Sequence, residues 1–230
     1  MIVNISPESF GGQMRMGDII ACANVVAHFR KIDNDHVKFY IAEAVKPWGH
    51  VMEFLSWMTM HTDYFSADPG NINLPWRHVN LWDYRDIAGD LVTIQNDRSQ
   101  VNKVVVAPLF DADYNLYRNW PHEVYINIIK ECNELYPDWD KVIVHKNLAA
   151  PTGWRASYDL AQSLEEIMTA RIYYGGDTGL SHFAGALSSG PEPIYFTSSR
   201  GLLHTTPINW YTNKKGQLKT YYLNMENTQW

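Results

Sequence analysis

The chain has 230 residues, of which 46% are hydrophobic and 19% charged, and its formal net charge is −6. This composition is typical of a globular protein with a large core, and the negative charge gives no electrostatic reason to expect binding to nucleic acid or to an anionic membrane. The amino terminus has neither the basic nor the apolar region of a signal peptide, and no apolar run approaches the roughly 20 residues that span a bilayer. We therefore expect a soluble, cytoplasmic protein.

Cysteine and aromatic residues give two further indications. Cys22 and Cys132 are far apart in the sequence, and both fall in segments with a helical pattern, so we expect reduced thiols in the core. Aromatic residues make up 13% of the chain, and many stand in polar surroundings, as in residues 74–86. Half-buried rings suit sugar faces and nucleobases, but they also fill cores and interfaces, which is the default interpretation for any one of them.

The first half of the chain alternates between strand and helix patterns. Asp18 stands at the N-cap position of an apolar helical stripe. Residues 62–100 have no clear pattern apart from a short strand, and we assign them to the rest of a first domain and its linker. The expected elements are strands at 1–6, 36–43 and 78–83 and helices at 18–31 and 46–61.

The second half repeats the alternation. The β-branched run after Lys103 is typical of a buried parallel strand, and Pro121 opens a helix. The expected elements are strands at 103–109, 140–147, 171–176 and 192–199 and helices at 122–136, 163–170 and 178–189. This spacing predicts an α/β protein with two small Rossmann-like domains, 1–100 and 101–230, whose parallel sheets face a cleft.

The turn between the strand at 171–176 and the next helix is the strongest candidate for a site. It reads Gly-Gly-Asp-Thr-Gly over residues 175–179, and Asp177 and Thr178 can cap the helix. The N–H groups of residues 178–181, together with the helix dipole, would form an anion site, with His182 one turn further on. The alternative is a tight turn with ordinary capping and a satisfied histidine. The turn matches neither the P-loop nor the dinucleotide-binding fingerprint.

Three segments, in the same order, resemble the heptosyltransferase family, whose members transfer a sugar from ADP-heptose to lipopolysaccharide core. Residues 175–187, "GGDTGLSHFAGAL", resemble its signature at the donor site. Residues 15–31, "RMGDIIACANVVAHFRK", resemble its Gly-Asp-aliphatic opening. Residues 117–129, "YRNWPHEVYINII", resemble the basic-x-Trp-Pro segment that opens its second domain.

The resemblance implies a GT-B fold in which 1–100 binds the acceptor and 101–230 binds a nucleoside-diphosphate sugar. It also implies an inverting, metal-independent transfer without a cofactor, and it makes Asp18 the general base. A carboxylate that removes the proton of the attacking hydroxyl fits that chemistry. Asp18 can equally be a plain helix cap, and the two roles are compatible.

The resemblance also implies the donor-binding residues. Arg118 stands where the family usually has lysine, and it would grip phosphate oxygens unless it is an ordinary surface arginine. Asp177 would order the loop or bond the transferred sugar, and His182 would contact the phosphates. The remaining candidates are the phosphate-binding Thr178, Gly179, Leu180, Ser198 and Ser199, with Arg200 beside them, and the loop-forming Gly17, Gly175 and Gly176.

Several alternatives stay open. Family members are commonly longer, and no acidic residue for the donor ribose is evident after the strand at 140–147. The chain could therefore be an inactive GT-B-like protein that binds a nucleotide or glycan, or another Rossmann-type enzyme such as a sugar epimerase. A transferase acting on hydroxylated bases of viral DNA is a further alternative, disfavoured by the acidic charge. The sugar, nucleotide, acceptor and oligomeric state are not determined by the sequence.

Overall fold

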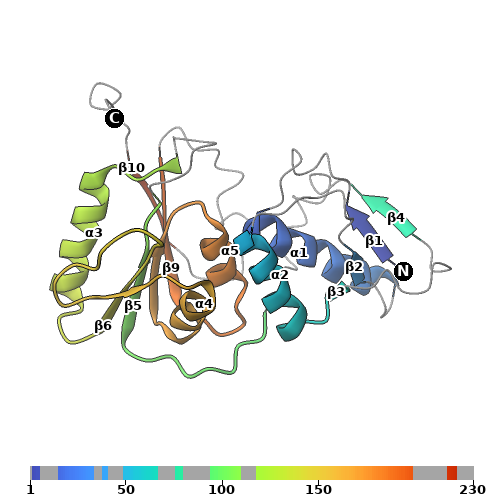
Figure 1. Cartoon of the computed structure of the whole chain (residues 1–230), viewed down its shortest axis with the longest axis horizontal. Helices are drawn as coiled ribbons and strands as arrows, with labels where there is room; N and C mark the ends of the chain where they lie inside the picture. Colours follow the sequence, from blue (N-terminus) through green and yellow to red (C-terminus); the bar gives the residue numbers. More distant parts are fainter. Residues whose placement is uncertain are drawn as a thin grey trace. The chain divides into compact units, whose positions relative to one another are not determined.

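The computed structural model describes residues 2–5, 15–33, 38–40, 49–66, 76–79, 94–109, 118–198 and 217–221. The chain divides into two compact units, Met1–Ile94 and Gln95–Trp230. Figure 1 shows that each unit has its own sheet with helices beside it.

The described strands of the first unit form a parallel sheet in the order β3-β2-β1-β4. These strands are β1 (Ile2–Ile5), β2 (Lys38–Tyr40), β3 (Phe65–Ser66) and β4 (Trp76–Val79). Helix α1 (Met16–Asp33) lies between β1 and β2 in the chain, and α2 (Gly49–His61) lies between β2 and β3. The neighbours β1 and β4 are not consecutive, so the sheet reverses its direction of growth between them, as in Rossmann-type folds.

The middle of α1 is buried on all sides. Residues 19–26 are buried without interruption, and Phe29 follows with 2% exposure, as expected for a helix that is apolar all round. Helix α2 adds Val51, Phe54 and Met58, which have no exposed surface. Together with Phe65 of β3 and with Ile94, these helical residues make up the core of the first unit as far as its side chains are described.

The second unit contains a parallel sheet in the order β10-β9-β8-β5-β6-β7. Its described strands are β5 (Lys103–Ala107), β6 (Asp140–Val144), β7 (Arg155–Ser157), β8 (Ile172–Gly175), β9 (Glu192–Ser198) and β10 (Gln217–Tyr221). The chain adds β6 and β7 on one side of β5 and then returns to add β8, β9 and β10 on the other side. The topological switch point therefore lies between β5 and β8.

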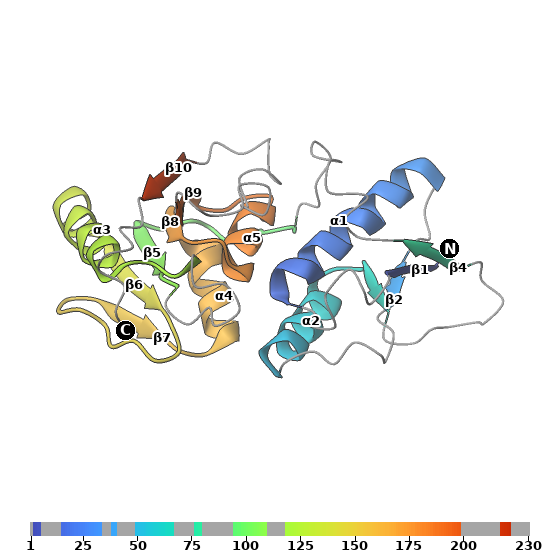
Figure 2. The same ribbon diagram turned by 90° about the horizontal axis from the view of Figure 1, so that it is seen from above.

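Helices cover both faces of this sheet. Figures 1 and 2 show α3 (His122–Leu135) on one face and α4 (Leu160–Thr169) and α5 (Gly179–Ala186) on the other. All five residues of β5 are buried, as expected for a parallel strand covered on both faces. The core on the α3 face contains Val104, Val106, Trp120, Tyr125, Ile128, Ile129, Cys132, Ile143, Trp154, Ile172, Tyr174, Ile194 and Phe196.

The structure differs from the sequence expectations mainly at short edge elements. β3, β7 and β10 were not expected. Each is defined by backbone pairing with a neighbouring strand, and such pairing leaves no strong pattern in two to five residues. Helix α4 begins at Leu160, three residues earlier than expected, because the Asp159 side chain accepts the N–H of Gln162 and caps the helix there.

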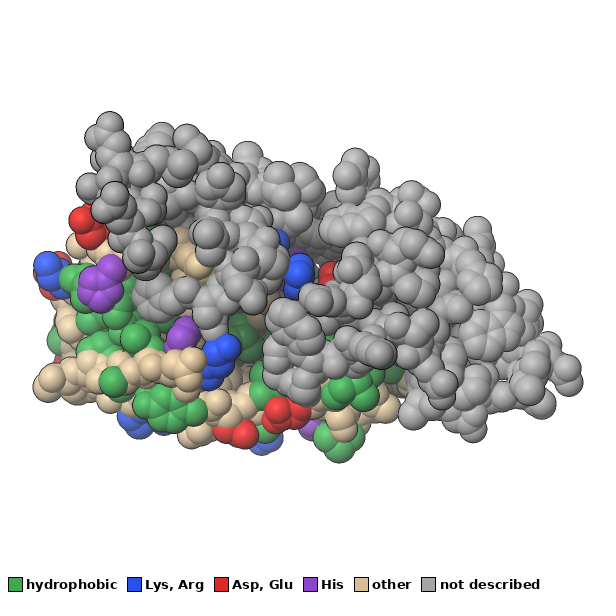
Figure 3. Space-filling view, turned by 45° about the horizontal axis from the view of Figure 1, so that its top comes forward, with side chains coloured by type: hydrophobic (Ala, Val, Ile, Leu, Met, Phe, Trp, Pro, Cys, Tyr) green, Lys and Arg blue, Asp and Glu red, His purple; other side chains and the backbone are tan. Residues whose placement is uncertain are grey.

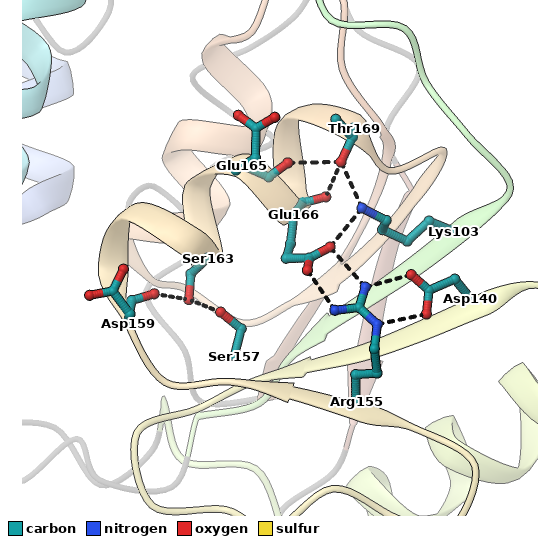
Figure 4. Close-up of polar contacts among 9 residues, drawn as sticks. All are labelled: Lys103, Asp140, Arg155, Ser157, Asp159, Ser163, Glu165, Glu166 and Thr169. Carbon is teal, nitrogen blue, oxygen red and sulfur yellow. Dashed lines mark hydrogen bonds and ion pairs between the residues drawn. The ribbon is translucent and has the colours of Figure 1, made fainter.

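A network of charged side chains links the amino ends of β5, β6 and β7 to α4 (Figure 4). The carboxylate of Glu166 accepts from Lys103 at 2.6 Å and from Arg155 at 2.8 Å, and Arg155 also pairs with Asp140 at 2.5 Å. Lys103 and Glu166 each expose only 10% of their side chains. This network lies at the edge of the sheet opposite to the carboxyl ends of the strands.

The remaining global expectations concern thiols, membrane segments and surface charge. Cys22 and Cys132 are buried and free, as expected. Within the described residues, no helix is both long and apolar enough to cross a bilayer. On the face drawn in Figure 3, the acidic and basic side chains of the described residues are interspersed with apolar and uncharged surface.

Candidate functional site at the switch point of the second unit

Two chain segments meet at the carboxyl ends of β5 and β8. The strands pair in parallel, and the last residues of each, Ala107 and Gly175, are partners. Arg118 and Trp120 follow β5, and the N–H of Trp120 donates to the carbonyl of Leu109 at 2.7 Å, which brings the chain back to the end of the strand. The turn that begins α5 follows β8. Both segments therefore lie at the switch point, where open α/β sheets bind their ligands.

Of the two capping residues that the sequence predicted, Asp177 and Thr178, it is Thr178 that caps helix α5. Its backbone is extended, with φ −135° and ψ 164°, and its hydroxyl accepts the N–H of Ser181 at 3.3 Å. The N–H of Thr178 itself donates to the Gly176 carbonyl at 3.0 Å. The expectation of four available N–H groups was therefore wrong for two of them, because Thr178 and Ser181 use theirs within the turn. Among the described residues, nothing accepts the N–H groups of Gly179 and Leu180, the first two of the helix.

The two glycines before the cap are required by close packing. A Cβ atom at Gly175 would lie 2.5 Å from the hydroxyl oxygen of Ser181 and would also overlap the ring of Tyr173. A Cβ atom at Gly176 would lie 2.9 Å from the indole nitrogen of Trp120. The double glycine therefore lets three buried side chains pack directly against the backbone of the turn.

Buried hydroxyl groups lie beneath the turn. The hydroxyls of Tyr173 and Ser181 are 3.0 Å apart, and that of Thr178 is 3.3 Å from Ser181. Burial raises the pKa of Tyr173 above its usual range, even though the hydrogen bonds from neighbouring hydroxyls oppose the shift. Tyr173 therefore stays neutral and acts as a fixed hydrogen-bonding group that supports the first turn of α5.

Arg118 and Asp177 form an ion pair across the switch point. The Nη2 atom of Arg118 lies 2.6 Å from Oδ2 of Asp177, and the two side chains are only 17% and 10% exposed. Arg118 is thus directed toward the turn and is not an ordinary surface arginine. Because the carboxylate and the guanidinium come from the segments that follow two adjacent strands, the pair joins both segments of the candidate site.

Asp18 lies in the first unit and occupies a different helical position from the one expected. Helix α1 begins at Met16, and the N–H of Ile19 donates to the Arg15 carbonyl at 3.2 Å, so Arg15 is the N-cap residue. Asp18 is the third residue of the helix, where its Oδ2 accepts the N–H of Arg15 at 2.7 Å. This is the return bond of a capping box. The expectation of an N-cap at Asp18 was wrong because the N-cap is Arg15, three residues earlier.

The other candidates lie near these anchors or outside the described residues. Gly17 is in the first turn of α1, and Leu180 and His182 are half-buried in the first turn of α5. Ser198 is the last residue of β9, and its side chain is not described. Ser199 lies outside the described residues, as does Arg200.

The sequence analysis did not predict the buried side chains that pack against the turn. Trp120 was noted only as part of a motif, and Tyr173 only as part of a strand, yet both are fully buried against the glycines. A signal was present for Tyr173, because successive residues of a strand face opposite sides and the pair Tyr173 and Tyr174 must therefore place one ring beneath α5. No comparable pattern indicates the position of Trp120.

Comparison with solved structures identifies the fold. The chain aligns with the iron-containing dodecameric glycosyltransferase TibC of enterotoxigenic Escherichia coli with a TM-score of 0.52 and 10% identity, over 85% of this chain and 57% of TibC. It aligns with the E. coli heptosyltransferase WaaC, solved with ADP, with a TM-score of 0.50 and 11% identity, over 96% and 93% of the two chains. The fold is that of heptosyltransferase-like GT-B glycosyltransferases.

A third alignment is with E. coli ADP-heptose lipopolysaccharide heptosyltransferase II, with a TM-score of 0.48 and 12% identity over 97% of this chain and 91% of that enzyme. No protein-family model matches the sequence, and no curated protein matches it either. This chain spans little more than half the length of TibC. Within the part of the chain that is described, no three His, Cys, Asp or Glu side chains are grouped so that they could hold a metal ion.

Proposed function

We propose that this chain is an inverting glycosyltransferase that moves a sugar from a nucleoside-diphosphate donor to an acceptor hydroxyl without a metal ion. The observation that carries the proposal is the convergence of Arg118, Asp177 and the start of α5 at the switch point between β5 and β8. The GT-B fold supports glycosyl transfer as the chemistry.

The second unit would bind the donor. As the bond between the anomeric carbon and the phosphate oxygen breaks, the diphosphate gains negative charge. The Arg118 guanidinium and the N–H groups of Gly179 and Leu180, at the positive end of the α5 dipole, are suited to stabilise that charge. His182, half-buried in the same turn, would add a phosphate contact.

The first unit would bind the acceptor and supply the base. The acceptor oxygen attacks the anomeric carbon from the side opposite to the leaving phosphate oxygen, which inverts the configuration, and Asp18 removes the hydroxyl proton. The bond from the Arg15 N–H to Oδ2 holds the Asp18 carboxylate at the start of α1. In this role the capping-box bond sets the orientation of the catalytic carboxylate.

The test combines nucleotide binding with turnover. ADP, UDP, GDP, CDP and dTDP are compared by thermal shift, and a nucleotide at about 100 times its dissociation constant should stabilise the fold by roughly 2.7 kcal/mol, or several degrees. The Asp18→Asn variant should show the same shift, because Asn keeps an oxygen for the Arg15 N–H. Its rate of nucleotide release from the matching sugar donor, with supplied glycan acceptors, should fall about 100-fold or more.

Asp63→Asn is the matched control in the same unit, since Asp63 is 76% exposed and pairs with Arg30, and it should keep full turnover. Near-normal turnover of Asp18→Asn would remove Asp18 as the base. No shift with any nucleotide would refute the donor site. A nucleotide shift without turnover of any donor would instead indicate a GT-B-like binding protein.

A further inference from the structure

We infer that Asp177 is a positioning residue that holds the Arg118 guanidinium against the turn before α5, ready for the diphosphate of the donor. The inference rests on the proposed function, and it gives Asp177 a task distinct from contact with the transferred sugar. It follows from three features of the site: the ion pair itself, the rigid placement of the Asp177 backbone, and the anchoring of the segment that carries Arg118.

The Asp177 backbone is fixed on both sides. Gly176 precedes it, packed against Trp120, and its carbonyl accepts the N–H of Thr178. Thr178 follows it and caps α5. Asp177 also has a short side chain with few rotamers, so its carboxylate occupies a defined place at the switch point. It is therefore a rigid partner for the guanidinium, with 10% of its side chain exposed.

The backbone near Arg118 is anchored as well. Trp120, two residues later, is fully buried, lies 5.4 Å from the ring centroid of Phe196 and closes the segment through the Leu109 carbonyl. An arginine side chain has high rotamer entropy, which binding an anion would have to overcome. The pair with Asp177 at 2.6 Å reduces that cost before the ligand arrives, which is the general effect of preorganisation.

The direction in which diphosphate affinity changes when the charge of Asp177 is removed distinguishes positioning of Arg118 from direct repulsion of the ligand by the carboxylate. A carboxylate repels a diphosphate, so removing the charge of Asp177 would strengthen binding if Asp177 acted only through its own field. A guanidinium carries five N–H donors, so one bond to a carboxylate oxygen is compatible with a phosphate contact. If Asp177 positions Arg118, removing its charge weakens diphosphate binding, although the site becomes less negative.

The experiment is a double-mutant cycle on the full chain, with isothermal titration of the nucleoside diphosphate that stabilises the wild type most. Asp177→Asn and Arg118→Gln should each weaken binding about tenfold, and the double variant should bind no more weakly than Arg118→Gln alone. Asp177→Ser, which also suits a turn, is measured in parallel in case Asp177→Asn does not fold.

Asp140→Asn is the matched control. It removes a carboxylate paired with an arginine at 2.5 Å in the same unit, but at the opposite edge of the sheet, so it should lower the melting temperature and leave the dissociation constant unchanged. Binding of Asp177→Asn as tight as or tighter than that of the wild type would overturn the inference. The inference would also be overturned if adding Asp177→Asn to Arg118→Gln weakened binding as much as Asp177→Asn does in the wild type. If the wild type binds none of the nucleotides, the donor site and the inference fall together, whereas the other outcomes leave the donor site intact.

Discussion

Packing against the turn, and not a left-handed backbone, explains the two glycines that precede α5. Among the described residues, Gly153 is the glycine with a positive φ, 81°, and nothing lies near the place of its Cβ atom. Gly175 is the reverse case, because the hydroxyl of Ser181 and the ring of Tyr173 occupy the space that a side chain would need. Gly153 is thus favoured by its backbone conformation, whereas Gly175 is required by close packing.

This difference predicts the effect of adding a methyl group. Gly175→Ala should lower the free energy of unfolding by about 2–3 kcal/mol, since the buried Tyr173 ring cannot move without a shift of its neighbours. Gly153→Ala should cost about 1 kcal/mol, as a purely conformational effect. Urea unfolding of both variants measures the difference, and equal losses would contradict the packing explanation.

At the scale of elements, the helices of this chain begin in different ways. Helix α4 is capped by Asp159 and α5 by Thr178, each through a side chain that accepts an N–H of the first turn. Helix α3 begins after Pro121 without a side-chain cap. Of these starts, that of α5 follows β8 at the switch point, so its cap is the one expected to matter for both stability and ligand binding.

The two side-chain caps make a matched pair for experiment. Asp159→Ala should lower stability by about 1 kcal/mol, because the Gln162 N–H loses its acceptor. Thr178→Ala should cost less than that, because the Ser181 N–H also donates to the Thr178 carbonyl at 3.1 Å. Only Thr178→Ala should also weaken nucleoside-diphosphate binding, since the order of the first turn of α5 depends on it. Thermal unfolding with and without nucleotide measures both effects. A binding loss of the same size in Asp159→Ala would argue against a donor site at α5.

At the scale of the whole molecule, acid stability should depend on the charged network beside α4. Burial alone would raise the pKa of Glu166, but the hydrogen bonds from Arg155 and Lys103 outweigh it and lower the pKa below its usual value. The hydrogen bonds from Arg155 likewise lower the pKa of Asp140. Groups with a lowered pKa in the folded state stabilise the fold above their unfolded pKa, and this contribution is lost as the pH falls through the folded pKa.

We therefore expect the stability of the wild type to decrease progressively below about pH 5. Glu166→Gln should lose about 3 kcal/mol at pH 7, because the buried Lys103 loses its negatively charged partner, and its stability should vary less with pH in the acid range. Glu165→Gln is the control, since Glu165 is half-exposed and lies 3.5 Å from Arg98, and it should change stability by less than about 0.5 kcal/mol. Chemical unfolding between pH 3 and 7 tests this, and a wild-type-like Glu166→Gln would refute the role of the network.

The sequence predicted the regular elements well where several residues share one pattern. The apolar pattern of α1 and the buried run of β5 were recognised because burial of a helix or strand requires many residues of one kind. The short strands β3, β7 and β10 were not recognised, since each is defined by the strand beside it. At the site, Thr178 was one of the two caps that the sequence predicted for α5, but the predicted N-cap of α1 at Asp18 was three residues too late.

By itself, the sequence determined the α/β class, the strand–helix alternation and the residue types of the candidate site, because these depend on local pattern and on chemistry carried by single side chains. The tertiary structure alone decided the strand order β10-β9-β8-β5-β6-β7, and with it the meeting of Arg118 and Asp177 at 2.6 Å. These two residues are separated along the chain by α3, β6, β7, α4 and β8. Only the parallel pairing of β5 with β8 brings them together, and such long-range pairing depends on the packing of the whole sheet and not on any local sequence signal.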